Sequence, residues 1–108
     1  MTHAEVTNLL ATAKKQCNII NYAKGIKKAI EERQSIHDEM DTTDDNDKWL
    51  ALYDEMRNKE RAIVMKIRHF YEMQYGKGNI FNTNNKGRGY LEYLWAFQDS
   101  ARIYGIKF

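Results

Sequence analysis

The sequence has no proline in 108 residues and only one cysteine, Cys17. A single cysteine cannot form an internal disulfide, so a disulfide framework is excluded. No apolar run approaches the roughly 18 residues that a transmembrane helix needs. The first ten residues, MTHAEVTNLL, have neither the basic n-region nor the apolar h-region of a signal peptide. These features predict an intracellular, cytoplasmic protein with no membrane contact, in which Cys17 is a small buried side chain.

Metal-binding and catalytic motifs are also missing from the sequence. His3, His37 and His69 do not have the spacing of metal ligands, and there is no nucleophile elbow, phosphate-binding loop or dinucleotide fingerprint. The acidic segment at 41–47 resembles a calcium loop only in composition, because Lys48 stands where a ligand is needed and the sixth position is not glycine. We therefore expect no metal, no cofactor and no enzymatic activity.

The chain does contain enough apolar material for one folded domain over residues 1–108. Apolar residues make up 43% and charged residues 30% of the sequence, and a chain of this size buries about two-thirds of its surface on folding. The net charge of +2 is unevenly distributed: residues 1–37 sum to +3, residues 38–56 to −7 and residues 57–108 to +6. Such a dipolar layout affects partners and solubility rather than the fold.

Two apolar stripes on different helix faces occupy the first forty residues. Thr2 and Glu5 fit a capping box, which predicts a helix from residue 3. One stripe contains Val6, Leu9, Leu10, Ala13, Cys17 and Ile20, and the other, nearly opposite, contains Tyr22, Ile26, Ala29, Ile30, Ile36 and Met40. Gly25 lies near the change of face and is costly inside a helix. We therefore predict a break between helices at 3–22 and 26–40; the alternative is one long helix whose halves face different neighbours.

The polar segment at 41–46 reads as the acidic tip of a helical hairpin. A helix over about 46–75 follows, with a straight apolar stripe that contains Trp49, Leu52, Tyr53, Met56, Ile63, Val64, Ile67, Phe70 and Tyr71. The short connection makes this helix the antiparallel neighbour of 26–40. Arg33 and Glu60 both fall in the middle of the facing stripes, so we predict an interhelical ion pair that fixes the register. The alternative, a buried Glu60 that acts as a general acid or base, is disfavoured because a guanidinium keeps a carboxylate ionised.

Residues 76–89 contain four of the six glycines and are predicted to form a loop. A C-terminal amphipathic helix is expected at 88–105, with its stripe on Tyr90, Leu94, Phe97, Ala101, Tyr104 and Phe108. The fold class is therefore all-α, a small helical bundle built on an antiparallel hairpin. A second apolar strip at Ala62, Met65 and Met73 needs a cover, which the C-terminal helix, a second copy or a foreign protein would supply. A homodimer is thus one expectation.

Two charged surfaces are the candidate contact sites. The basic one, interleaved with aromatic residues as in proteins that bind phosphates and stack on bases, consists of Lys66, Arg68, Lys77, Phe81, Lys86 and Arg88. The acidic one, at the hairpin tip, consists of Asp41, Asp44, Asp45 and Asp47.

The sequence supports two hypotheses of function. The small size, absent proline and asparagine-rich loop suit accessory proteins of phages and mobile elements. The first hypothesis is therefore a non-enzymatic protein that binds a host or viral protein, for example a phage-type inhibitor of a host enzyme or defence complex. The second is a small nucleic-acid-binding regulator that uses the basic loop and the C-terminal helix.

Overall fold

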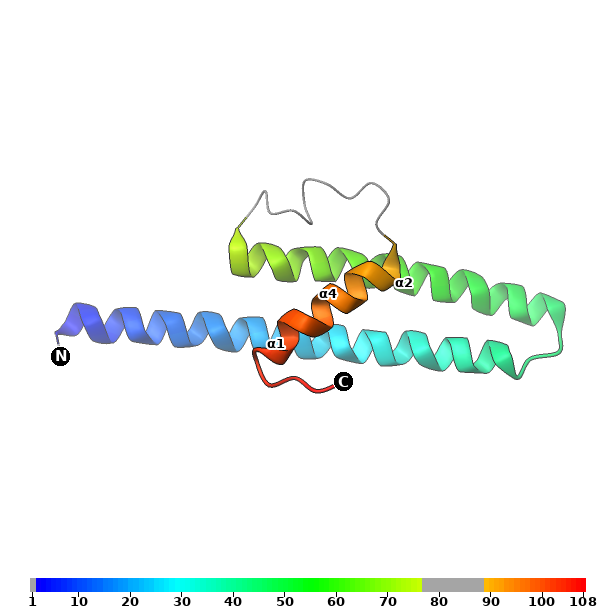
Figure 1. Cartoon of the computed structure of the whole chain (residues 1–108), viewed down its shortest axis with the longest axis horizontal. Helices are drawn as coiled ribbons and strands as arrows, with labels where there is room; N and C mark the ends of the chain where they lie inside the picture. The colour runs from blue at the N-terminus through cyan, green and yellow to red at the C-terminus, as the bar shows by residue number, and fades with distance from the viewer. Residues whose placement is uncertain (1, 77–88) are drawn as a thin grey trace.

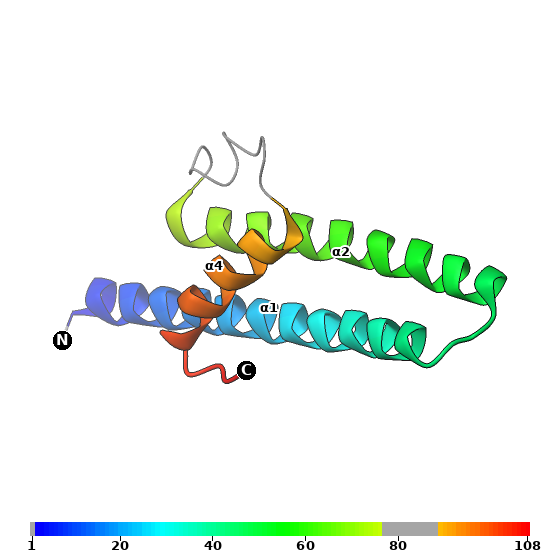
Figure 2. The ribbon, with the colours of Figure 1, turned by 45° about the vertical axis from the view of Figure 1, so that its right-hand side comes forward.

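The computed structural model describes residues 2–76 and 89–108. These residues form three α-helices and no strand: α1 (His3–Asp41), α2 (Asn46–Tyr75) and α4 (Tyr90–Arg102). α1 and α2 lie side by side and antiparallel, and α4 crosses them obliquely (Figures 1 and 2). The predicted all-α class and the helix at 46–75 are confirmed. None of the helices in the described ranges combines the length and apolar character needed to cross a membrane.

α1 is one continuous helix of 39 residues, so the predicted break into helices at 3–22 and 26–40 is wrong. A glycine inside a helix costs only about 1 kcal/mol relative to alanine, which is too little to end a helix that continues on both sides of it. A Cβ at Gly25 would meet nothing within 4 Å, so no close contact requires glycine there. The apolar stripe changes face because the two halves of α1 have different surroundings, the alternative that the sequence left open.

The molecule is a rod of 66 × 26 × 18 Å with a radius of gyration of 17.6 Å, against about 13 Å for a compact chain of this length. It is long because α1 extends well past the C-terminal end of α2, as Figure 1 shows. Every residue from 2 to 18 is exposed. We call this segment, residues 2–18, the overhang.

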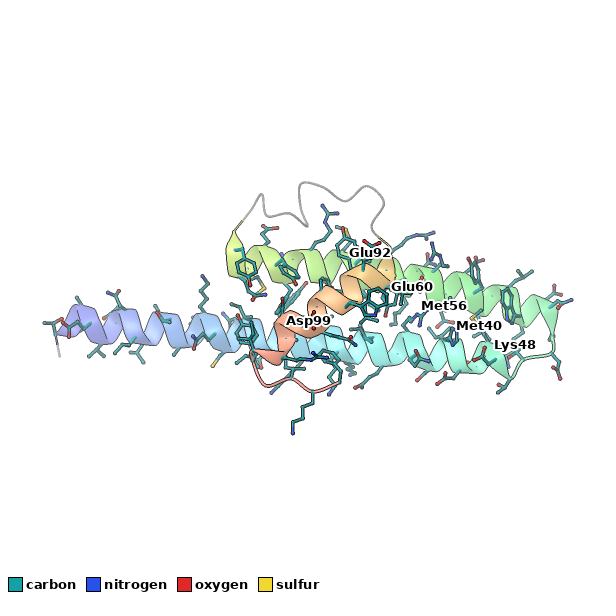
Figure 3. All side chains as sticks on the ribbon, in the orientation of Figure 1. Met40, Lys48, Met56, Glu60, Glu92 and Asp99 are labelled. Atoms are coloured by element: carbon teal, nitrogen blue, oxygen red, sulfur yellow. The ribbon has the colours of Figure 1, made fainter. Side chains whose placement is uncertain are left out.

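The core lies where the three helices meet. α1 contributes its middle turns, α2 its C-terminal half and α4 one face; the buried residues are Ile19, Ala23, Ile26, Ala29, Ile63, Ile67, Phe70, Tyr71, Tyr93, Phe97, Ala101 and Ile106. Tyr93 was not expected among them, although it lies one turn before Phe97 and faces the same way. A smaller cluster near the hairpin tip consists of Ile36, Met40, Leu52 and Met56, with Met40 and Met56 facing each other in Figure 3.

The tip end of the hairpin is only two helices thick, which exposes part of the predicted α2 stripe. Trp49 and Tyr53 were expected in the core, but each is 39% exposed. Their rings stack on each other, with centroids 5.5 Å apart and planes inclined by 9°. Among the described residues no third element packs at this end, so the hairpin covers only one side of such rings.

α4 is shorter than the predicted helix at 88–105, beginning at Tyr90 and ending at Arg102. The chain leaves it through a glycine turn: the amide of Gly105 donates to the carbonyl of Arg102 at 3.0 Å, and the amide of Ile106 donates to that of Ala101 at 3.3 Å. Gly105 has a φ of 77°, in the left-handed region that favours glycine. This turn places Ile106 in the core.

Candidate functional site

The overhang is held in helical form by its own N-terminal cap. The hydroxyl of Thr2 accepts from the amide of Glu5 at 3.2 Å, and the carboxylate of Glu5 accepts from the amide of Thr2 at 3.2 Å. This reciprocal capping box satisfies two of the free amide groups at the helix start. The helix also continues without interruption into the packed part of α1. The overhang therefore projects from the body as a preformed helix.

One face of the overhang is apolar and uncovered by the described part of the chain. Val6, Leu9 and Leu10 are 40%, 56% and 66% exposed. Cys17 is exposed as well, so its predicted burial is wrong. Four residues at spacings of four, three and four form the centre of this face, and we call them the overhang seam: Val6, Leu10, Ala13 and Cys17. The seam carries no charged residue.

The seam points away from the rest of the hairpin. Val6 lies twenty positions before Ile26, which corresponds to about 160° around the helix axis. Ile26 is buried against α2 and is only 1% exposed. The stripe predicted as core at 6–20 is therefore a surface feature over most of its length, and Ile19, beside it, begins the true core.

A polar cluster crosses the interface between α1 and α2, between the two apolar clusters. Arg33 donates to one oxygen of Glu60 through Nε at 3.1 Å and Nη2 at 2.9 Å, and Arg57 donates to the other oxygen at 2.9 Å. This is the pair of Arg33 and Glu60 that the stripes predict. Glu60 is only 6% exposed (Figure 3). Both of its oxygens thus accept from guanidinium groups, and the pair with Arg33 links α1 to α2 at this position.

Tyr90, at the start of α4, covers this cluster. The guanidinium of Arg33 lies 5.0 Å from the centre of its ring. Its hydroxyl is buried without a hydrogen-bond partner among the described residues. Burial raises the pKa of Tyr90 above its ordinary value of 10.0; Arg33 opposes this shift and Glu60 adds to it.

An open pocket of about 420 Å³ adjoins Tyr90 and is lined also by Arg57, Glu60, Val64 and Met65. It ends at Gly89, where the described chain resumes. We assign no ligand to it.

The acidic side chains of the hairpin tip stabilise the ends of the helices. Asp45 caps α2 by accepting from the amides of Asp47 and Lys48 at 2.9 and 3.3 Å, and Asp47 lies in the first turn, where the helix dipole favours a negative charge. Lys48 pairs with Glu39 across the turn at 3.5 Å. Of the predicted acidic surface, Asp41, Asp44, Asp45 and Asp47, all four are exposed at this end of the rod.

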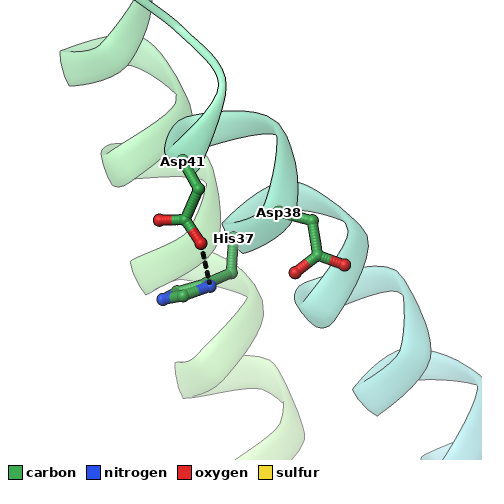
Figure 4. Close-up of side chains that lie close together, drawn as sticks. All are labelled: His37, Asp38 and Asp41. Atoms are coloured by element: carbon green, nitrogen blue, oxygen red, sulfur yellow. Dashed lines mark ion pairs between the residues drawn. The ribbon is translucent and has the colours of Figure 1, made fainter.

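His37, Asp38 and Asp41 gather on the last turns of α1, with one potential ligand atom from each within 4.8 Å of the others (Figure 4). Nδ1 of His37 lies 3.6 Å from a carboxylate oxygen of Asp41. Asp38 accepts instead from the side-chain amide of Gln34 at 2.9 Å. Because the two aspartates are exposed and each already has a partner within the helix, we interpret the group as a surface network.

Only part of the predicted basic surface lies among the described residues. Lys77, Phe81, Lys86 and Arg88 lie outside the described residues. Lys66 is exposed on α2, and Arg68 is half-buried there, with Nη1 3.7 Å from the sulfur of Met65.

α4 does not cover the whole second strip of α2. Met73 packs against the core, whereas Met65 is 60% exposed and Ala62 is exposed as well.

We did not anticipate the overhang, because an apolar stripe in a short chain is usually packed within that chain. One signal could have indicated it: a stripe that faces away from the partner helix throughout its length. No protein family, curated protein or solved structure matches the chain.

Proposed function

We propose that the chain is a non-enzymatic protein-binding module that receives a helix of its partner along the overhang seam. The observation that supports this proposal is the apolar face of the overhang, which the described part of the chain leaves uncovered. Every residue of the overhang, from 2 to 18, is exposed. Most helices in proteins gain their stability by packing an apolar face. In the overhang that face is available to another molecule.

The seam spacing indicates the kind of partner. Apolar residues that alternate at four and three positions form the stripe with which two helices pack in a coiled-coil manner. Val6, Leu10 and Ala13 repeat this spacing, and Cys17 extends it by one more step. The partner segment is therefore an amphipathic helix with a matching apolar stripe.

The charges of the overhang distinguish protein binding from nucleic-acid binding. Its charged residues, Glu5, Lys14 and Lys15, all lie outside the seam. Binding through the seam is therefore apolar and depends weakly on salt. A nucleic-acid complex would weaken steeply with salt, because each phosphate contact releases counterions. The sequence leads us to expect that the partner is a protein of a host or virus. This remains a proposal, and identification of the captured protein tests it.

The experiment compares two alanines of the overhang. Ala13 belongs to the seam, whereas Ala11, two positions earlier, faces about 200° away, and both are exposed. Tagged wild-type protein, Ala13→Glu and Ala11→Glu are used to capture partners from cytoplasmic extract, with and without nuclease. We expect one protein to be retained by wild type and Ala11→Glu, lost with Ala13→Glu and unaffected by nuclease.

Two outcomes contradict the proposal. Equal capture by Ala13→Glu would show that the seam is not the binding surface. Partners that disappear on nuclease treatment would favour the nucleic-acid-binding hypothesis instead.

A further inference from the structure

We propose that the helix received by the overhang seam is the same seam of a second copy of this chain, lying antiparallel. This inference rests on the proposed function and specifies its partner. The spacings between the seam residues, four, three and four, are the same when the direction of the chain is reversed. An antiparallel copy centred between residues 11 and 12 therefore places an apolar residue against every seam residue.

The sizes of the seam residues also match in this arrangement. Leu10 of one copy lies opposite Ala13 of the other, and Val6 lies opposite Cys17. Each pair sets a larger side chain against a smaller one, which is how packed helix faces interdigitate. The seam itself contains no charged residue, since Glu5, Lys14 and Lys15 of the overhang lie outside it. A dimer of this kind is isologous: the same patch is used on both copies.

The direction of pairing follows from the sizes of the seam residues. A parallel pair would set Leu10 against Leu10 and Ala13 against Ala13 of the second copy, so that large side chains meet large ones and small meet small. In the antiparallel register each larger side chain meets a smaller one. The antiparallel arrangement is therefore favoured.

The body of the protein leaves room for the second helix. The seam points about 160° away from the face that packs against α2, and in Figures 1 and 2 the overhang projects beyond the end of α2. The two helices would overlap over residues 3–20, a length of about 27 Å. A contact one helix wide and this long is smaller than the roughly 800 Å² per partner of a standard interface. The dimer should therefore be weak and reversible.

Sedimentation velocity over a range of protein concentrations tests the association. We expect the wild type and Ala11→Glu to shift from the monomer mass of 12.8 kDa toward twice that value as concentration rises. Ala13→Glu should stay monomeric over the same range, because it places a charge in the seam of each copy. Circular dichroism confirms that both variants keep their helix content.

Cysteine pairing tests the direction. In the antiparallel register Cys17 of the two copies is offset by eleven residues, about 16 Å along the axis, too far for a disulfide, whose Cα atoms lie within about 7 Å. Val6→Cys adds a cysteine directly opposite Cys17 of the second copy. We expect Val6→Cys to form a covalent dimer on mild oxidation, whereas the wild type and Val6→Cys combined with Cys17→Ser should not.

Each other outcome overturns the inference. A wild-type protein that stays monomeric at every concentration, a dimer that survives Ala13→Glu, or a wild type linked through Cys17 itself would each exclude the antiparallel seam dimer. The two proposals can be told apart. If the chain is monomeric but Ala13→Glu loses a captured foreign protein that Ala11→Glu retains, the proposed function stands and only the self-association is wrong. If Ala13→Glu changes neither association nor capture, both proposals are wrong.

Discussion

Replacement of Glu60 by alanine should destabilise the protein strongly. The carboxylate is buried and holds two guanidinium groups, one of which, Arg33, is only 17% exposed at its side chain. Removing one partner of a buried ion pair leaves a charge without compensation and typically costs about 3–5 kcal/mol. For a chain of this length, about 1 kcal/mol corresponds to roughly 4 °C in melting temperature. Glu60→Ala should therefore lower the melting temperature by about 12–20 °C.

Three further variants assign this loss to the pair. Glu60→Gln keeps the size of the side chain and one acceptor, so its effect should be smaller. Arg57→Ala removes the half-exposed partner, and pairs of that kind contribute about 0–1 kcal/mol. Arg33→Met combined with Glu60→Leu removes both charges of the buried pair, and such replacements are often neutral or stabilising.

The assay is thermal unfolding followed by circular dichroism at 222 nm. The reasoning is refuted if Glu60→Ala melts within about 2 °C of the wild type, because less than about 0.5 kcal/mol would then depend on the carboxylate. It is also refuted if the Met and Leu double variant is as unstable as Glu60→Ala, because the loss would then come from packing rather than from an uncompensated charge.

Three other predictions concern stability. Gly25→Ala should stabilise the chain by about 1 kcal/mol, because alanine is the better helix former and its Cβ meets no atom within 4 Å; a lower melting temperature would contradict a continuous α1. Tyr71→Phe should lower the free energy of unfolding by about 1 kcal/mol, since the hydroxyl of Tyr71 donates to the carbonyl of Ala96 at 2.8 Å. Tyr90→Phe should instead be neutral or stabilising, because it removes a buried hydroxyl with no described partner. Urea unfolding in which Tyr90→Phe is the less stable of the two variants would disprove this assignment. Burial raises the pKa of both tyrosines above 10.0, so as the pH rises these side chains ionise in the unfolded chain before they do in the folded one. Their contribution to the free energy of unfolding should therefore be fully present below pH 10 and be lost as the pH rises above it. Urea midpoints measured between about pH 8 and 11 should decline less in the double variant Tyr71→Phe with Tyr90→Phe than in the wild type, and an equal decline would assign the effect to other groups.

Much of the hairpin could be predicted because its signals are local and agree with one another. The stripe of α2 has a single period over thirty residues, and the short polar turn forces the neighbouring helix to be antiparallel. Counting outward from that turn is then enough to bring Arg33 opposite Glu60. The pairing followed from geometry alone, and no information about more distant contacts was needed.

The sequence-based predictions that were wrong share one cause, the assumption that a small chain packs into a compact body. That assumption favoured a break at Gly25, which the intact α1 contradicts. It also placed Cys17 and Tyr53 inside, although a rod with a two-helix end leaves both without full cover. Whether an apolar stripe is filled by the same chain or by another molecule depends on tertiary arrangement, which the period of the stripe does not encode.

The unbroken α1 also fixes the distance and the rotation between its two ends. Its 39 residues separate the first turn of the overhang from the acidic tip by about 58 Å, and each added residue would turn one end relative to the other by about 100° while lengthening the rod by only 1.5 Å. In the antiparallel pair proposed above, the two acidic tips would lie at opposite ends, about 90 Å apart. Molecules docked at the two ends would thus be held at a set distance and a set rotational phase, fixed by the number of residues between them.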